Sequence, residues 1–192
     1  MSDNANNQNE QLHDQVAQTA ARAAASRAGY ELVRLYAKNC SLETPELPEI
    51  FGTPWKPSVK VNFATHSKLL NQSKDDSPVK LASYEVVLRV TVTCTVGEKT
   101  AYICEVNQAG IFVLRNIVKQ EEIEAILGAI APNTLFPYAR ESISNLVNRA
   151  TFPALNLTPV DFVNLYRARK IQEAQKQAAA QQAAEKKEEP VA

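Results

Sequence analysis

The segment from residue 84 to residue 112 constrains the fold of this chain more than any other. Large apolar side chains alternate with mostly polar ones over Tyr84–Thr95, and a second alternating run follows over Thr100–Phe112. A period of two is typical of a β-strand with one buried face. The residues between the runs (VGEK, 96–99) predict a tight turn. The sequence therefore predicts an antiparallel hairpin within a larger sheet.

The two faces of this hairpin differ in composition. On the return strand, one phase holds Tyr102, Cys104, Val106 and Gln108. The other phase holds Ala101, Ile103, Glu105 and Asn107. Ile103, like Val87 on the first strand, thus lies among polar neighbours. Isolated exposed aliphatic side chains are common, so this placement has an ordinary explanation. Alternatively, one face packs against a core and the other docks a partner.

Composition excludes several classes of protein. The 192 residues suffice for one domain with tails, and 21 basic residues balance 21 acidic ones. Nucleic-acid binders normally carry a basic excess, so nucleic acid is not an expected partner. Cys40, Cys94 and Cys104 form no C-x-x-C pair, which favours reduced thiols. Neither a long apolar run nor a secretory signal is apparent, so we expect a cytoplasmic protein without membrane insertion.

The remaining segments predict more strands and then helices. Residues 1–29 hold few large apolar groups and read as a flexible extension. Tyr30–Glu43 and Val59–Phe63 read as strands, separated by a proline-rich crossover that contains Trp55. That loop either packs onto the core or is available to bind a partner. Residues 71–80 read as a long polar turn.

Helical spacing begins near Lys119, and Pro132 is expected to interrupt it before it resumes after Pro137. Thr158–Asp161 predicts the start of a short C-terminal helix, and residues 171–192 read as a flexible Ala/Gln/Lys/Glu-rich tail. Strands followed by helices indicate the α+β class, here a four-stranded antiparallel sheet with helices on one side.

No motif for catalysis is present. The chain lacks phosphate-binding and dinucleotide-binding loops, a zinc-protease motif and a nucleophile elbow, and its five glycines form no glycine-rich loop. Glu85 and Glu105 fall in the polar strand phase, where a solvated face explains them better than paired acid–base catalysis. We expect a binding protein with no cofactor or metal. A small apolar ligand held between sheet and helices is the alternative, and an enzyme is third.

Two segments resemble the SecB family of bacterial protein-export chaperones. They are Ser83–Gly110 and Leu135–Phe162, and the runs LFPYARE and TFPALNLTPV within the second are specific. The likeness extends over roughly Tyr30–Tyr166, so a SecB-like domain is placed at residues 30–170.

The resemblance implies a holdase without ATPase activity, assembled as a homotetramer from two dimers. Such a chaperone binds unfolded precursor polypeptides in hydrophobic grooves, keeps them competent for translocation and delivers them to the motor protein SecA. It also implies one long helix, about Lys119–Arg149, at the dimer–dimer interface.

Residue roles follow from the same resemblance. The residues implied in client binding are Trp55, Tyr102, Cys104, Val106 and Gln108. The residues implied in SecA docking are Glu43, Ile103 and Glu105. The chain departs from the family in having Asn39 where Asp is common, in its neutral charge, in the long 71–80 turn and in the extension at residues 1–29.

Overall fold

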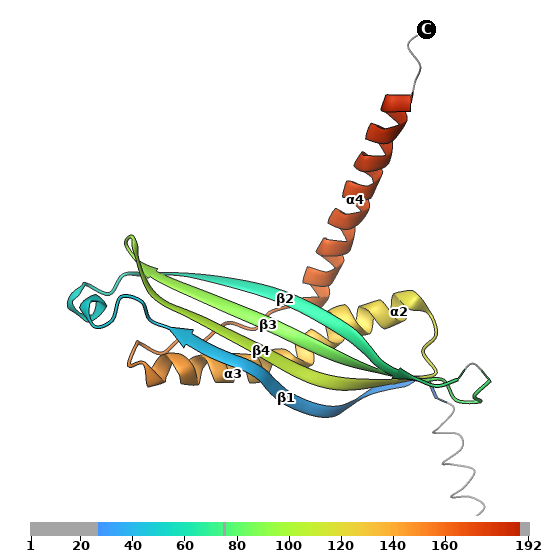
Figure 1. The fold of residues 1–192 in the computed structure, drawn as a ribbon, viewed down its shortest axis with the longest axis horizontal. Helices are drawn as coiled ribbons and strands as arrows, with labels where there is room; N and C mark the ends of the chain where they lie inside the picture. Colours follow the sequence, from blue (N-terminus) through green and yellow to red (C-terminus); the bar gives the residue numbers. More distant parts are fainter. Residues whose placement is uncertain (1–26, 75, 189–192) are drawn as a thin grey trace, which may run out of the picture.

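The computed structural model describes residues 27–74 and 76–188, with side chains of the last helix described as far as Gln177. One antiparallel sheet holds four strands in the order β1-β4-β3-β2 (Figure 1). The strands are β1 (Gly29–Glu43), β2 (Pro57–Gln72), β3 (Leu81–Val96) and β4 (Lys99–Arg115). The helices are η1 (Glu49–Gly52) in the crossover, then α2 (Gln120–Ala125), η2 (Ile126–Ile130), α3 (Ala131–Arg149) and α4 (Phe162–Glu188). The α+β class is confirmed.

The predicted hairpin is present as β3 and β4. Its turn is short, and Gly97 adopts a positive φ of 61° there. Two-residue hairpin turns need such left-handed conformations, which glycine adopts without strain. The register places Val90 opposite Val106 and Val92 opposite Cys104. The apolar phase of both strands therefore faces one side of the sheet, as the alternation predicts.

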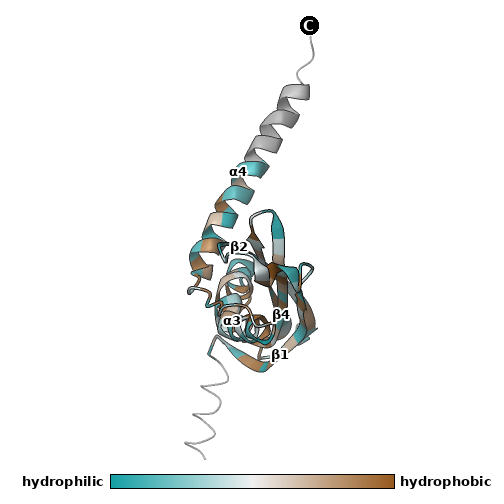
Figure 2. Ribbon diagram, turned by 90° about the vertical axis from the view of Figure 1, so that its left-hand side faces the viewer, coloured by the Kyte–Doolittle hydropathy of each residue, from teal (hydrophilic) through white to brown (hydrophobic). Residues whose placement is uncertain are grey.

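The core lies between this apolar phase and the helices. Val86, Leu88, Val90 and Val92 are fully buried on β3. Four buried residues of α3 recur every fourth position and face them: Leu135, Ala139, Ile143 and Val147. Figure 2 views the molecule from the side, with the helices on one side of the sheet. Within the described residues, no helix covers the opposite, open sheet face.

β2 is longer than the predicted strand, Val59–Phe63. It continues to Gln72, so the predicted 71–80 turn begins about two residues later. Thr65 pairs with Leu88 and Ser67 pairs with Val86, which places both polar residues in the inward phase. Because these positions carry no apolar side chain, the alternation that marks a strand disappears from the sequence at this point.

The helical region is one continuous run from Gln120 to Arg149, so Pro132 does not interrupt it. The run contains a π turn, η2, just before this proline. In this π turn the Ala131 N–H donates to the Ile126 carbonyl, five residues earlier. Pro132 follows directly, in the first turn of α3, where a missing N–H is tolerated. Pro137 lies inside α3, on its exposed side.

α4 is longer than the short C-terminal helix that the sequence predicts, and it projects away from the sheet (Figure 1). Its second half consists mainly of Ala, Gln, Lys and Glu, all of which favour helix. The helix thus runs through most of the predicted tail, residues 171–192. The predicted flexible extension, residues 1–29, lies outside the described residues except for its last three.

Candidate functional site

An open cleft of about 720 Å³ lies between the inner face of the sheet and the helices α2, η2 and α4. The sheet side contributes Val61 and Phe63 of β2 and Tyr84 of β3. The helical side contributes the apolar side chains of Ile123, Leu127, Phe162, Leu165 and Tyr166. Beside them it contributes polar and charged side chains: Gln120, Glu124, Arg169, Lys170, Gln172 and Glu173. Leu165 is 48% exposed, so apolar surface in the cleft is accessible from solvent. The cleft lies beside β2, which is an edge strand.

Three aromatic rings form a cluster where α4 begins. Phe63 meets the rings of Phe136 and Phe162 edge-on, with centroids 5.9 and 5.7 Å away. The rings of Phe136 and Phe162 lie 5.5 Å apart. Edge-to-face pairs in this range are favourable beyond their burial alone. The cluster fixes the first turn of α4 against both β2 and α3.

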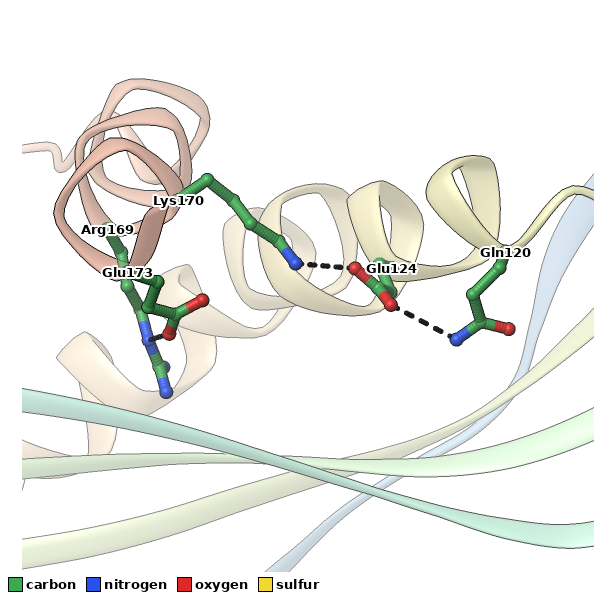
Figure 3. A network of polar contacts seen from close by, with 5 residues as sticks. All are labelled: Gln120, Glu124, Arg169, Lys170 and Glu173. Carbon is green, nitrogen blue, oxygen red and sulfur yellow. Dashed lines mark hydrogen bonds and ion pairs between the residues drawn. The ribbon is translucent and has the colours of Figure 1, made fainter. Parts of the chain in front are cut away.

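A second group of contacts attaches α4 to the π turn. An added Cβ at Gly128 would lie 2.7 Å from two ring carbons of Tyr166, so this ring lies directly on the glycine. Lys170 donates to Glu124 at 2.6 Å, and Gln120 donates to the same carboxylate at 3.2 Å (Figure 3). The hydrogen bond from Lys170 lowers the pKa of Glu124, and Glu124 in turn raises the pKa of Lys170.

The crossover loop carries a separate aromatic cluster centred on buried Phe152. Trp55 stacks on Phe152 with centroids 5.6 Å apart, and Tyr102 lies 5.0 Å from the same ring. Phe51 contacts Phe152 at 5.5 Å yet stays 54% exposed. The loop is therefore packed onto the core, as one of the two sequence interpretations holds, while Phe51 presents apolar surface to solvent.

Of the predicted client-binding residues, only Trp55 is not buried. The other four lie on the inner face of β4 with at most 4% exposure: Tyr102, Cys104, Val106 and Gln108. Burial raises the pKa of the Cys104 thiol to about 11 and also raises that of Cys94. Because these four side chains are buried in this fold, they can affect a bound chain only by packing against the residues that contact it. Their part in client binding stays a prediction.

The predicted SecA-docking residues lie together on the open sheet face. Glu43 pairs with Ile103 across β1 and β4. Glu105 follows in the same phase, and its carboxylate accepts hydrogen bonds from Thr91 and Asn107, both at 3.2 Å. Arg89 approaches the same carboxylate at 3.5 Å. The geometry brings the three residues onto one surface, and their docking role stays a prediction.

Sequence reasoning did not identify the cleft. Phe162, Leu165 and Tyr166 formed a visible apolar stripe at the start of a polar helix, and this stripe was the available signal. Nothing in the sequence shows that Tyr166 meets Gly128, because that contact joins residues distant along the chain. Among residues 27–74 and 76–188, no group of acidic, histidine and cysteine side chains could hold a metal ion. In the same part of the chain, no helix has the length and apolar character needed to span a membrane.

Comparison with solved structures gives two distant matches. A SecB-like chaperone of Mycobacterium tuberculosis, Rv1957, in complex with a ChAD peptide from the Rv1956 HigA1 antitoxin, is 16% identical, with a TM-score of 0.47 over 76% of this chain and 96% of that one. A protein of unknown function from Streptococcus agalactiae is 14% identical, with a TM-score of 0.38 over 69% of this chain and 98% of that one. The sequence profile of the family described as preprotein translocase subunit SecB matches residues 23–173. The match covers well over half of the sequence, and the chain therefore belongs to the SecB family, a family of chaperones rather than enzymes.

Proposed function

We propose that this protein is an ATP-independent holdase that binds unfolded precursor polypeptides and delivers them to SecA from the cytoplasm. The observation that carries the proposal is the open cleft between β2 and α4, whose lining includes accessible apolar side chains such as Leu165. Unfolded chains differ from folded ones in exposing apolar side chains and unpaired backbone. The cleft accepts the first, and the adjoining edge strand β2 suits the second through strand addition.

The energetics favour weak capture at many points. Burying one apolar client side chain contributes about 1.5–3 kcal/mol before ordering costs are subtracted. A single cleft is therefore a weak site. A homotetramer, which the family membership supports, presents several clefts to one long client and raises the effective concentration of each. Folding hides the client's apolar side chains, so binding and folding compete.

Release requires a partner, because the sequence contains no nucleotide-binding motif. A motor that binds the chaperone differently with and without client can drive transfer. We assign this docking to the open-face residues Glu43, Ile103 and Glu105, which lie on the sheet face opposite the cleft. Separate faces allow client and motor to bind at the same time, which a delivery step needs.

The experiment is a refolding assay with a slow-folding precursor and equimolar protein. The native chain is expected to delay refolding. Leu165→Asp places a charge in the cleft and is expected to weaken client affinity by about tenfold, the loss of about one apolar anchor. Val118→Asp is the matched control, because Val118 is 70% exposed and does not line the cleft.

Two results would contradict the proposal. One is a native protein that leaves refolding unchanged at equimolar dose. The other is equal weakening by Leu165→Asp and Val118→Asp, which would remove the cleft from client binding. Calorimetry with a metabolite panel tests the alternative function: a small apolar ligand that binds stoichiometrically and displaces unfolded protein would assign the cleft to that ligand instead.

A further inference from the structure

The cleft between β2 and α4 carries its charged side chains as two ion pairs. Its lining includes two acidic and two basic residues: Glu124, Glu173, Arg169 and Lys170. The Lys170 ammonium lies 2.6 Å from the Glu124 carboxylate, and the Arg169 Nε lies 2.9 Å from the Glu173 carboxylate (Figure 3). The formal charge of the lining is therefore zero, and each charge already has a partner of opposite sign within the protein.

The pair of Glu124 and Lys170 is held by further contacts on both sides. Glu124 belongs to α2 and also accepts a hydrogen bond from Gln120 at 3.2 Å. Lys170 belongs to α4, and its ammonium lies 5.8 Å from the centroid of the Tyr166 ring, within the range in which an aromatic face attracts a cation. A client carboxylate would have to displace the contacts of Lys170, and a client ammonium would have to displace those of Glu124.

A simpler explanation accounts for one of the two pairs. Arg169 and Glu173 are four residues apart on α4, and pairs with this spacing stabilise an exposed helix wherever it lies. The explanation does not extend to Glu124 and Lys170, which are 46 residues apart and join two helices across the cleft. The balance of charge in the lining is therefore more than a property of α4 alone.

The other polar residues of the lining are uncharged. They are Asn62, Thr65, Ser67, Gln120 and Gln172, with the phenol of Tyr84. Thr65 and Ser67 lie in the inward phase of β2, where they continue the row that begins with Val61 and Phe63. Hydroxyl and amide groups both donate and accept hydrogen bonds, so they suit uncharged polar side chains. A strand added beside β2 would place every second side chain on this inward side, against apolar and uncharged polar neighbours in turn.

We propose that the cleft selects extended client segments in which uncharged polar residues accompany the apolar ones, and that it does not discriminate by the sign of a client's charge. This inference rests on the proposed function, because it names the kind of polypeptide segment that the cleft binds. Apolar client side chains contact Val61, Phe63 and Leu165, and hydroxyl or amide side chains form hydrogen bonds beside them. A charged client residue of either sign finds the charges of the lining engaged, so it loses hydration without gaining an ion pair.

The test is fluorescence anisotropy with three labelled peptides that share the same two leucine anchors. Their remaining positions are all serine, all glutamate or all lysine. The serine peptide is expected to bind about threefold more tightly than either charged peptide, and the two charged peptides are expected to agree within about twofold. Because the lining has no net charge, added salt is expected to change the affinity of the native protein for all three peptides little.

Two matched substitutions shift the charge of the lining in opposite directions. Glu124→Gln and Lys170→Gln break the same ion pair, so any loosening of α4 is common to both. Glu124→Gln leaves a positive charge unpaired and is expected to favour the glutamate peptide over the lysine peptide by about threefold, and Lys170→Gln is expected to reverse that preference. The exchange Glu124→Lys/Lys170→Glu keeps the lining neutral and is expected to show neither preference.

Several results would overturn the inference. One is a native protein that prefers one charged peptide over the other by more than about fivefold, and another is a charged peptide that binds as tightly as the serine peptide. The same sign preference in both single variants would also contradict it, as would no binding of any of the three peptides. The refolding delay separates this test from that of the holdase: if the delay persists, only the selection of segments is wrong, and if it is absent as well, the proposed function fails too.

Discussion

Gly128→Ala is the substitution whose effect the structure specifies most closely. The new methyl group would lie 2.7 Å from two ring carbons of Tyr166, closer than carbon atoms approach without displacement. The backbone of η2 is held between α2 and α3, so the ring has to move. Because Tyr166 lies near the start of α4, its displacement loosens the attachment of α4 beside the cleft.

Two opposing free-energy contributions set the magnitude. Replacing glycine by alanine inside a helix stabilises it by about 1 kcal/mol. Overpacking a filled contact costs about 1–3 kcal/mol. The net change in the free energy of unfolding therefore lies between about zero and a loss of about 2 kcal/mol. The cost falls on the contact between α4 and η2, whereas the gain in helix propensity stabilises η2 itself.

Hydrogen exchange read by mass spectrometry separates these two contributions. A local loss of about 1.4 kcal/mol speeds exchange of amides in the first turns of α4 by roughly tenfold, while β3 and β4 stay unchanged. Gly52→Ala is the control, because an added Cβ there meets nothing within 4 Å. Unchanged exchange in α4 of the Gly128→Ala protein would refute the argument that this ring contact holds the helix.

Three further substitutions test other parts of the account. Ile103→Arg places a charge in the open-face docking set and is expected to abolish SecA binding in a pull-down while the refolding delay persists; loss of client binding as well would contradict the separation of the two faces. Trp55→Ala is expected to weaken capture of an unfolded client in an anisotropy titration, and an unchanged affinity would limit Trp55 to packing on Phe152. Glu85 has a folded-state pKa below its ordinary value of 4.5, so its interactions stabilise the native state above that pH and are lost as pH falls through the folded-state pKa. Urea unfolding of Glu85→Gln is therefore expected to show less loss of stability on acidification below about pH 4.5 than the native protein, and parallel pH profiles would disprove the assignment.

The hairpin was predictable because both of its strands lie inside the sheet. β3 and β4 each have a neighbour on both sides, and their inward phase is covered by α3. Residues such as Val90 and Val106 are therefore fully buried, and the alternation in the sequence is strong. The placement of Ile103 and Glu105 on the opposite face followed from that parity alone.

β2 was only partly predictable because part of its inward phase borders the cleft instead of a packed helix. Thr65 and Ser67 line that cleft, so apolar side chains are not required at their positions. The missing alternation thus marks the candidate site. The continuous helix was unpredictable from local pattern for another reason. The π turn that directly precedes Pro132 leaves no sequence signal, and only the resemblance to SecB implied an unbroken helix.

The structure limits how far residue roles can be transferred from a family. The four residues of β4 that the resemblance implies in client binding are buried: Tyr102, Cys104, Val106 and Gln108. Strand parity placed all four on one face correctly, yet parity does not show whether helices cover that face. The resemblance supplied a functional role, and the structure adds that these side chains lie in the core of the described chain. Accessible apolar side chains include Leu165 in the cleft and Phe51 on the crossover loop instead.

The most direct test of the central claim compares one secretory protein in two states. Its folded form and a reduced, alkylated and permanently unfolded form are titrated separately into the native chaperone by calorimetry. The account predicts that the unfolded form binds and the folded form does not, and that Leu165→Asp weakens the binding by about tenfold. Equal affinity for the two forms, or no binding of the unfolded one, would contradict the claim that this chain captures polypeptides through apolar surface that folding hides.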